Sequence, residues 1–322
     1  MKISISKISY HIPNNCNSLK ELKEDNPDWD VDRIYSKTGI NKRYIANESE
    51  TASDLAYEAC IKLFDKIDVE DIDLLVFVTQ SPDYKLPTTA CIMQERLKLN
   101  KNIMAFDLNL GCSGFVYALS VVGSLIESKL ATNAILICSE TYSKYISRDD
   151  RTCRPLFSDA ASVVLIQKSE SDLIGPYDFG TDGSKHHHLI VPGSGFKTCF
   201  DMTKNNKLHM SGSDVFLFTL DAVPNSIISI LEKSNLSIQN IDLFIFHQAS
   251  KVVLDSIIAK IGLPASKVFN NYNSIGNTVS ASIPIALADA KNCGLLKKGD
   301  KIIVSGFGVG LSWGSVLINW NY

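Results

Sequence analysis

The chain has 322 residues, about twice the size of a typical domain, and 45% of them are hydrophobic while 21% are charged. Its 32 lysine and arginine residues nearly balance 35 aspartate and glutamate residues, so the net charge is −3. This composition excludes a disordered chain, and without a basic excess it argues against a nucleic-acid-binding protein.

The first residues predict a strand rather than an export signal or a membrane anchor. Residues 1–7 alternate apolar and polar side chains, and no window approaches the roughly 18 consecutive apolar residues of a membrane helix. We therefore expect a cytoplasmic location and no association with a membrane.

The spacing of the eight cysteines argues against several kinds of site. No two of them form a C-x-x-C pair, which argues against zinc ribbons, iron–sulfur sites and redox motifs. The chain is also longer than the small secreted domains that depend on disulfide frameworks. The run from His186 to His188 has Asp182 as its one nearby acid in the sequence. It is interpreted as a solvated loop, and no metal site is expected.

The chain contains two similar halves. Residues 71–82 and 240–250 are β-branched and aromatic runs typical of buried parallel strands, and a stretch with helical spacing of apolar residues precedes each. A glycine-containing turn that opens a further helix follows in each half, at residues 110–114 and 275–279, and residues 134–139 then match 301–305. The offset is 169 residues between Ile72 and Ile241, and 165 residues between Cys112 and Asn277. Three matches in one order predict two α/β halves, 1–170 and 171–322, with a seam near the glycine- and proline-rich stretch 168–185.

Equivalent turns of duplicated halves tend to meet, which would bring Cys112, His247 and Asn277 together. Cys112 opens the predicted helix 113–126, where the helix dipole favours a thiolate. His247 ends a predicted parallel strand, where α/β proteins build active sites, and a neutral imidazole can donate a hydrogen bond to an oxyanion. The Asn277 amide is a second donor. The alternatives are a buried apolar cysteine, a structural histidine and a plain helix N-cap.

A glycine-dense segment, residues 305–314, lies between two predicted strands. It predicts a β-hairpin, and its glycines would also allow backbone N–H groups to point at a ligand oxygen. The chain has no phosphate-binding P-loop and no dinucleotide-binding glycine motif at a helix start.

Together these motifs resemble the beta-ketoacyl-acyl-carrier-protein synthase III family over essentially the whole chain. The matching segments are residues 37–46, 105–107, 112–115, 157–161, 247–249, 276–278 and 308–315. The resemblance implies a thiolase-like α/β fold, in which two duplicated halves form a layered α-β-α-β-α architecture.

The resemblance also implies a two-step reaction. Cys112 would take an acyl group from an acyl-CoA or acyl-carrier-protein thioester, with the backbone N–H groups of Cys112 and Val309 as the oxyanion hole. His247 and Asn277 would hold the thioester oxygen of malonyl-carrier protein while it loses carbon dioxide and condenses with the acyl group. No cofactor is implied beyond the CoA or phosphopantetheine thioesters, and a homodimer is expected.

Further residues follow from the same resemblance. The substrate-binding positions would be Arg33, Lys37, Leu86, Arg151, Phe157, Phe216 and Gly308. Arg33 stands where family members carry a tryptophan that stacks on adenine, and Lys37 replaces an arginine. Leu86 falls where a phenylalanine often closes the acyl pocket across the dimer, so a longer or branched acyl group is expected to fit. Two basic carrier-docking positions appear as Leu217 and Val252, which leaves Lys251 and Lys260 as docking candidates.

Two other functions compete with condensation. An acyltransferase of the same fold would pass the acyl group from Cys112 to an amine or a hydroxyl, for example in a sugar or secondary-metabolite pathway. A degenerate subunit would only act as a scaffold. Retention of both His247 and Asn277 favours condensation, because simple acyl transfer does not need a site for an enolate.

Overall fold

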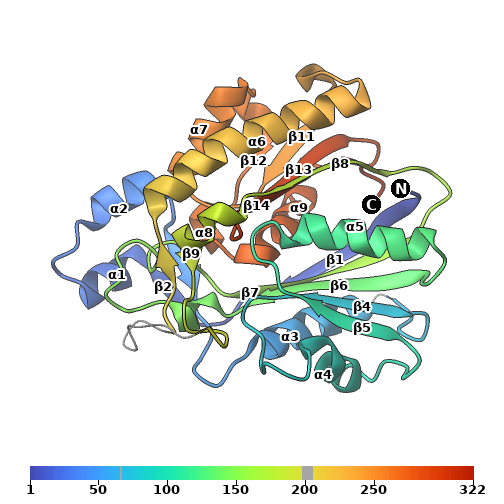
Figure 1. Cartoon of the computed structure of the whole chain (residues 1–322), viewed down its shortest axis with the longest axis horizontal. Coiled ribbons are helices and arrows are strands. Elements are labelled where there is room, and N and C mark those ends of the chain that lie inside the picture. Colours follow the sequence, from blue (N-terminus) through green and yellow to red (C-terminus); the bar gives the residue numbers. More distant parts are fainter. Residues whose placement is uncertain (66, 198–205) are drawn as a thin grey trace.

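Two five-stranded sheets with the same strand order form the framework of the chain (Figure 1). The computed structural model describes residues 1–65, 67–197 and 206–322. The first sheet runs in the order β1 (Ile3–His11), β7 (Ala160–Lys168), β6 (Asn133–Glu140), β4 (Leu74–Val78) and β5 (Met104–Leu108). The second runs in the order β8 (Ile174–Thr181), β14 (Ser312–Asn319), β13 (Lys301–Gly308), β11 (Leu243–Phe246) and β12 (Val268–Phe269). In each order the last three strands are parallel, and the first two are antiparallel to their neighbours.

Continuous apolar runs explain why these strands are buried on both faces. In β4, Leu74, Val76 and Val78 pack in the central core, whereas Leu75 and Phe77 pack in the outer core of the first sheet. Successive side chains of a strand point to opposite faces, so one run contributes to two cores. The predictions of buried parallel strands within 71–82 and 240–250 are confirmed.

Helices form three layers that alternate with the two sheets. The central layer is α5 (Gly114–Glu127) and α9 (Ser282–Asn292), and its core includes residues of both sheets. The outer face of the first sheet is covered by α3 (Ala52–Phe64) and α4 (Thr89–Arg96). The outer face of the second is covered by α6 (Gly212–Ser234) and α7 (Lys251–Ile261) (Figure 1). This arrangement confirms the expected α-β-α-β-α architecture.

The helix α6 is long and apolar enough to span a membrane by length and composition. It instead packs on β8, β13 and β14, and its buried face includes polar Thr219 and Ser226. The hydroxyl of Ser226 lies 2.8 Å from that of Ser315 in β14. These contacts are those of a core helix on a sheet.

Short elements flank the layers and build one wall of the site described below. A two-stranded pair, β2 (Cys16–Ser18) with β3 (Lys42–Tyr44), encloses α1 (Leu19–Asp25) and α2 (Val31–Thr38) in the sequence. A second pair consists of β9 (Leu189–Ile190) and β10 (His209–Met210), and α8 (Tyr272–Ile275) precedes Asn277. Single turns of 3-10 helix lie at Tyr142–Tyr145, Gly183–His188, Ile238–Asn240, Ala265–Lys267 and Val279–Ala281.

The shared strand order agrees with the internal repeat. Strands of the first sheet come from residues 3–168, and strands of the second come from residues 174–319. The stretch 168–185 is only partly a connection, because Gly175, Pro176 and Gly180 lie inside β8. This strand is at the edge of its sheet, where glycine and proline are tolerated. The division into 1–170 and 171–322 as separate units stays a prediction.

Candidate active site

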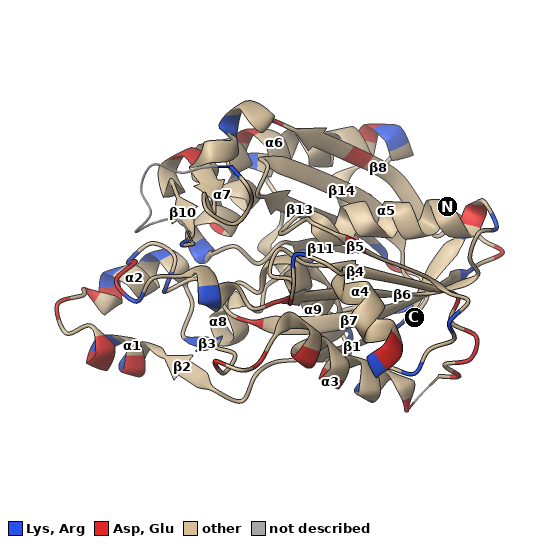
Figure 2. Cartoon of the chain, turned by 60° about the horizontal axis from the view of Figure 1, so that its bottom comes forward, with Lys and Arg blue, Asp and Glu red and all other residues tan. Residues whose placement is uncertain are grey.

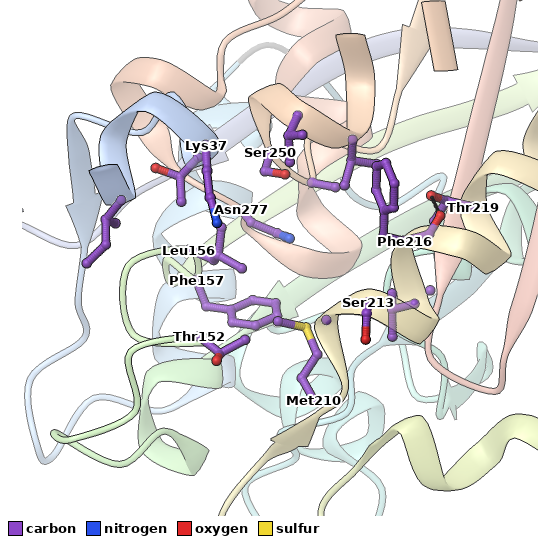
Figure 3. Close-up of a pocket in the computed structure, with 18 of the residues that line it drawn as sticks. Lys37, Thr152, Leu156, Phe157, Met210, Ser213, Phe216, Thr219, Ser250 and Asn277 are labelled. Carbon is purple, nitrogen blue, oxygen red and sulfur yellow. Dashed lines mark hydrogen bonds between the residues drawn. The ribbon is translucent and has the colours of Figure 1, made fainter. Parts of the chain in front are cut away.

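A cavity of about 660 Å³ brings the three expected catalytic residues together. Cys112, His247 and Asn277 all line it, and each is at most 5% exposed. Figure 3 shows Phe157, Phe216 and Asn277 turned into this cavity from three separate segments of the chain. Residues from both halves therefore form one site, as the repeat predicted for its equivalent turns.

Cys112 lies in the turn between β5 and α5, directly before the helix N-cap Ser113. The β13–β14 hairpin closes tightly over this turn. A Cβ atom on Gly306 would lie 2.6 Å from the Cys112 carbonyl oxygen, and one on Gly308 would lie 2.9 Å from the Cys112 Sγ atom. The glycines are therefore required so that the hairpin can approach the cysteine. The prediction of a hairpin for residues 305–314 is confirmed.

The Cys112 thiol is not activated as the sequence suggested. Burial, followed by the charge of Glu140, raises the pKa of Cys112 to about 12. Two backbone N–H groups, those of Val309 and of Cys112 itself, donate hydrogen bonds to the sulfur and oppose this rise. Burial therefore opposes the thiolate that the helix start is expected to favour.

His247 directly follows the end of β11 and is 2% exposed. Its Nδ1 atom lies 2.7 Å from the hydroxyl oxygen of Ser282, the first residue of α9. Burial lowers the pKa of His247 to about 3, so the imidazole is neutral at pH 7. When Ser282 donates to Nδ1, the ring proton is on Nε2, and that atom becomes a hydrogen-bond donor.

Asn277 is held by its backbone and by one side-chain atom. Its N–H donates to the Leu156 carbonyl at 2.9 Å, and its carbonyl accepts from the Ser158 N–H at 2.8 Å. Its side-chain Oδ1 accepts from the Val279 N–H at 3.0 Å. This bond fixes the amide so that the Nδ2 group is left as a donor. Asn277 does not cap α9, whose N-cap position is Ala281.

The segment after Asn277 contains a strained residue. Val279 has a φ of 53°, a left-handed conformation that is an outlier for a β-branched side chain. Its N–H is the group that binds Asn277, and its side chain is fully buried. Strain of this kind persists only where the surrounding structure enforces it, and it is found preferentially at active sites.

Glu140 is a buried carboxyl group that the sequence analysis missed, and its charge acts on Cys112. It ends β6, and it accepts hydrogen bonds of 2.8 Å from the hydroxyls of Ser81 and Ser280. Ser81 follows β4, and Ser280 lies in the segment after Asn277, so Glu140 connects the two halves at the site. Burial raises the pKa of Glu140 to about 7 against the effect of these bonds. The signal in the sequence was a single acid at the end of an apolar strand.

Replacing Glu140 with glutamine is expected to lower the pKa of Cys112. The variant removes a negative charge that disfavours the thiolate, so alkylation of Cys112 at pH 8.5 should accelerate by about threefold to tenfold. Iodoacetamide labelling followed by mass spectrometry across a pH series measures this change. The control is Ser280→Ala, which loosens the same hydrogen-bond network but keeps the charge. Equal acceleration in both variants, or none in Glu140→Gln, would contradict the electrostatic role.

The mouth of the cavity carries positive charge. Arg33 and Lys37 from α2 and Arg151 line it, as expected. Trp29, which the sequence analysis did not select, also lines it, and the Arg151 guanidinium lies 5.7 Å from the centroid of its ring. The indole is only 5% exposed, so the guanidinium, rather than the tryptophan, offers the accessible flat surface. Figure 2 shows both signs of charge on α2, so the mouth is not uniformly basic.

Three predicted residues lie away from this cavity. Leu86 is 81% exposed between β4 and α4. Lys251 begins α7, and its ammonium group forms an ion pair with Asp255. Lys260 lies near the other end of α7, and the helical repeat places it on the side opposite Lys251. The two lysines therefore do not form one basic patch.

The histidine run does not line this cavity. His186 and His187 are exposed in a 3-10 turn, and His188 Nδ1 lies 3.4 Å from a carboxylate oxygen of Asp214. Within the described ranges, no three histidine, cysteine or acidic side chains gather as metal ligands.

Comparisons with known proteins give a consistent result. The family model described as 3-Oxoacyl-[acyl-carrier-protein (ACP)] synthase III matches residues 106–183, and the model of its C-terminal part matches residues 231–320. A beta-ketoacyl-[acyl-carrier-protein] synthase III of Clostridium perfringens is 42% identical over 307 residues, which cover 93% of each chain.

Solved structures of synthase III proteins are also similar to this chain. A crystal structure of a 3-oxoacyl-(acyl-carrier-protein) synthase III has a TM-score of 0.95 and 37% identity, and the match covers 99% of this chain and 100% of the other. The 3-oxoacyl-(acyl carrier protein) synthase III of Pseudomonas aeruginosa PAO1 has a TM-score of 0.91 and 31% identity, with 100% and 99% covered.

Proposed function

The chain belongs to the 3-oxoacyl-[acyl-carrier-protein] synthase III family, and we propose how its own residues divide the work of an acyl-condensing enzyme. The reaction is the condensation of an acyl group with malonyl-carrier protein, which gives a beta-ketoacyl thioester. The proposal assigns acyl transfer to Cys112 and enolate stabilisation to His247 and Asn277. The observation that carries it is the convergence of these three buried residues on one cavity.

In the first step, the Cys112 sulfur attacks the carbonyl carbon of an acyl thioester. A new carbon–sulfur bond forms, the old one breaks, and the thiol proton passes to the departing CoA or phosphopantetheine sulfur. The N–H groups of Val309 and Cys112 would hold the oxyanion of the tetrahedral intermediate, since both lower the pKa of Cys112 and so favour negative charge beside it. Because the pKa of Cys112 is raised, proton loss must accompany attack rather than precede it.

In the second step, the malonyl carboxylate leaves as carbon dioxide, and its bonding electrons form an enolate. Donors from His247 Nε2 and Asn277 Nδ2 would stabilise the enolate oxygen. The enolate carbon then attacks the acyl carbonyl on Cys112, the carbon–sulfur bond breaks, and the thiolate takes up a proton. Neutral donors suit this step because the charge appears only as carbon dioxide departs.

The alternative of acyl transfer to an amine or a hydroxyl is less well supported. Such an acceptor must lose a proton, usually to a general base. A histidine whose pKa is about 3 is a poor base at pH 7, and Asn277 is held with its amide nitrogen free to donate. The site therefore suits an enolate better than an amine or a hydroxyl.

An acceptor-competition experiment tests the proposal. Protein acylated on Cys112 is mixed with malonyl-carrier protein, with an amine or with a sugar alcohol, and the products are identified by mass spectrometry. A beta-ketoacyl-carrier protein that forms only in the first mixture supports condensation. An amide or ester formed faster than the ketone would support the alternative.

The partners follow from the same proposal. The substrates would be an acyl-CoA or acyl-carrier-protein donor and malonyl-carrier protein, in the cytoplasm, with no metal or organic cofactor. We also propose a homodimer in which the exposed Leu86 of one protomer reaches the acyl pocket of its partner. Leu86 would then be buried rather than left exposed to solvent.

Docking of the carrier protein is expected to improve when basic residues are placed at the rim. Leu217 is 63% exposed and Val252 is 43% exposed, and they occupy positions where the resemblance implies basic side chains. A Leu217→Lys, Val252→Arg double variant should raise kcat/KM for malonyl-carrier protein about tenfold at low salt, because an acidic partner is steered by positive charge. Loading from acyl-CoA should stay within about twofold. A glutamine at both positions is the uncharged control, and an equal gain there would argue against charge steering.

A further inference from the structure

A second cavity, of about 240 Å³, adjoins the first. Val309, whose N–H points at the Cys112 sulfur, lines it, and Leu189 lines both cavities. The larger cavity is lined by Arg33, Lys37 and Arg151 and suits the carrier arm of a thioester. The smaller cavity is then the place for the acyl chain, an assignment that rests on the proposed function.

The inner wall of this smaller cavity is polar. Gln80, at the end of β4, lines it together with Tyr142 and Tyr145. The Tyr142 hydroxyl donates to Gln80 Oε1 at 2.9 Å, and the Tyr145 hydroxyl donates to the Gln80 carbonyl at 2.9 Å. These two hydrogen bonds hold Gln80 in place and occupy both of its oxygen atoms as acceptors.

The amide nitrogen of Gln80 is left as a donor. Among the described residues, no hydrogen bond from Gln80 Nε2 is formed, while Oε1 is taken by Tyr142. An alkyl chain packed against this amide would keep water from it and leave its N–H groups unpaired. An acyl group with an acceptor oxygen would pair with them, so the site discriminates between the two.

The charge around this cavity favours a neutral oxygen. None of the described residues that line it is lysine, arginine, aspartate or glutamate. Among the described residues, the acid Glu140 contacts the cavity wall, and its carboxylate accepts from the backbone N–H of Gln80 at 3.1 Å. A carboxylate on the acyl chain would meet this negative charge, and His186 is the one basic side chain among the described lining residues.

We infer that the acyl group accepted by Cys112 carries a neutral oxygen, as a hydroxyl or a ketone, that binds Gln80 Nε2. Gln80 is thus a specificity-determining residue for the loading step. Hydroxyacyl and ketoacyl thioesters share the acceptor oxygen, and the experiment distinguishes them.

The test compares single-turnover loading of Cys112 from four CoA thioesters by intact mass. 3-Hydroxybutyryl-CoA and butyryl-CoA differ by one hydroxyl, acetoacetyl-CoA carries a ketone, and succinyl-CoA carries a carboxylate. The loading rate constant with 3-hydroxybutyryl-CoA or acetoacetyl-CoA should exceed that with butyryl-CoA by about tenfold or more. Succinyl-CoA should load at the butyryl rate or more slowly.

The variant Gln80→Met keeps the length of the side chain but removes the amide. It should bring the ratio of the loading rate constants for 3-hydroxybutyryl-CoA and butyryl-CoA close to one, mainly through faster butyryl loading. Ser194→Ala is the matched control, since this lining hydroxyl already donates to the Val191 carbonyl at 2.9 Å, and its ratio should stay that of the unaltered protein.

The possible outcomes distinguish a failure of this inference from a failure of the proposed function. Butyryl loading as fast as hydroxybutyryl loading, a preference for succinyl, or an unchanged ratio in folded Gln80→Met overturns this inference and leaves the proposed function standing. If no thioester acylates Cys112, the proposed function fails, and the inference fails with it. Thermal unfolding and loading from acetyl-CoA check that Gln80→Met is folded.

Discussion

Replacing Cys112 with alanine is expected to abolish the acyl-enzyme and to lower the condensation rate by at least about 10⁴-fold. None of the other described cysteines lines the cavity, so none of these is expected to replace Cys112 as the acyl acceptor. His247 and Asn277 are unaffected by this change, so the variant should still decarboxylate malonyl-carrier protein without condensing it.

Two measurements check this expectation. Intact mass spectrometry after incubation with acyl-CoA should show a mass gain for the unaltered protein and none for Cys112→Ala. Carbon dioxide release from labelled malonyl-carrier protein should persist in the variant. Cys138→Ala is the control, because this cysteine is fully buried in the central core and should leave loading intact. Acylation of the Cys112→Ala protein would place the nucleophile elsewhere.

Replacing His247 with alanine is expected to slow decarboxylation and to leave the loading of Cys112 almost unchanged. Loss of one preorganised donor to the enolate oxygen costs about 10²-fold to 10³-fold in decarboxylation. Loading of Cys112 should stay within about threefold, because its oxyanion hole is built from the backbone of Cys112 and Val309. The two steps are thus expected to respond to separate substitutions within one cavity.

The control for this variant is His247→Gln, which restores an amide donor near the same position. It should recover part of the decarboxylation lost in His247→Ala, whereas a purely structural histidine would give no such rescue. Loading and melting temperature are recorded for both variants. A loss of loading that equals the loss of decarboxylation would mean that His247 acts in the first step as well.

The convergence of Cys112, His247 and Asn277 could be predicted from the sequence because the duplication is a long-range constraint. An offset of 165 residues aligned Cys112 with Asn277. The apolar run before His247 predicted the strand that His247 follows. The layered architecture followed from the family resemblance, and the structure agrees with both predictions.

The environment of those residues could not be predicted in the same way. The pKa of Cys112 depends on how deeply it is buried and on Glu140, which comes from another strand. The left-handed backbone of Val279 is imposed by neighbours, since no sequence preference would place a β-branched residue there. Gln80 and Tyr142 meet only in the folded chain, so the polar wall of the acyl cavity had no signature in the sequence.

The separation of Lys251 from Lys260 and the exposure of Leu86 also depend on the folded chain. Lys251 and Lys260 are close in the sequence, but the turn of α7 separates them. The role proposed for the exposed Leu86 requires a second copy of the chain, so a single chain gives no contact that tests it.

The central claim is that Cys112 holds the acyl group while His247 and Asn277 stabilise the enolate in the same cavity. A single-turnover reaction of acylated protein with labelled malonyl-carrier protein tests it most directly, with intact protein mass and carbon dioxide followed together. The account predicts that each molecule of carbon dioxide released accompanies the loss of one acyl group from Cys112, and that His247→Ala keeps its acyl group and releases little carbon dioxide. Loss of the acyl group without carbon dioxide, or unchanged release from His247→Ala, would contradict it.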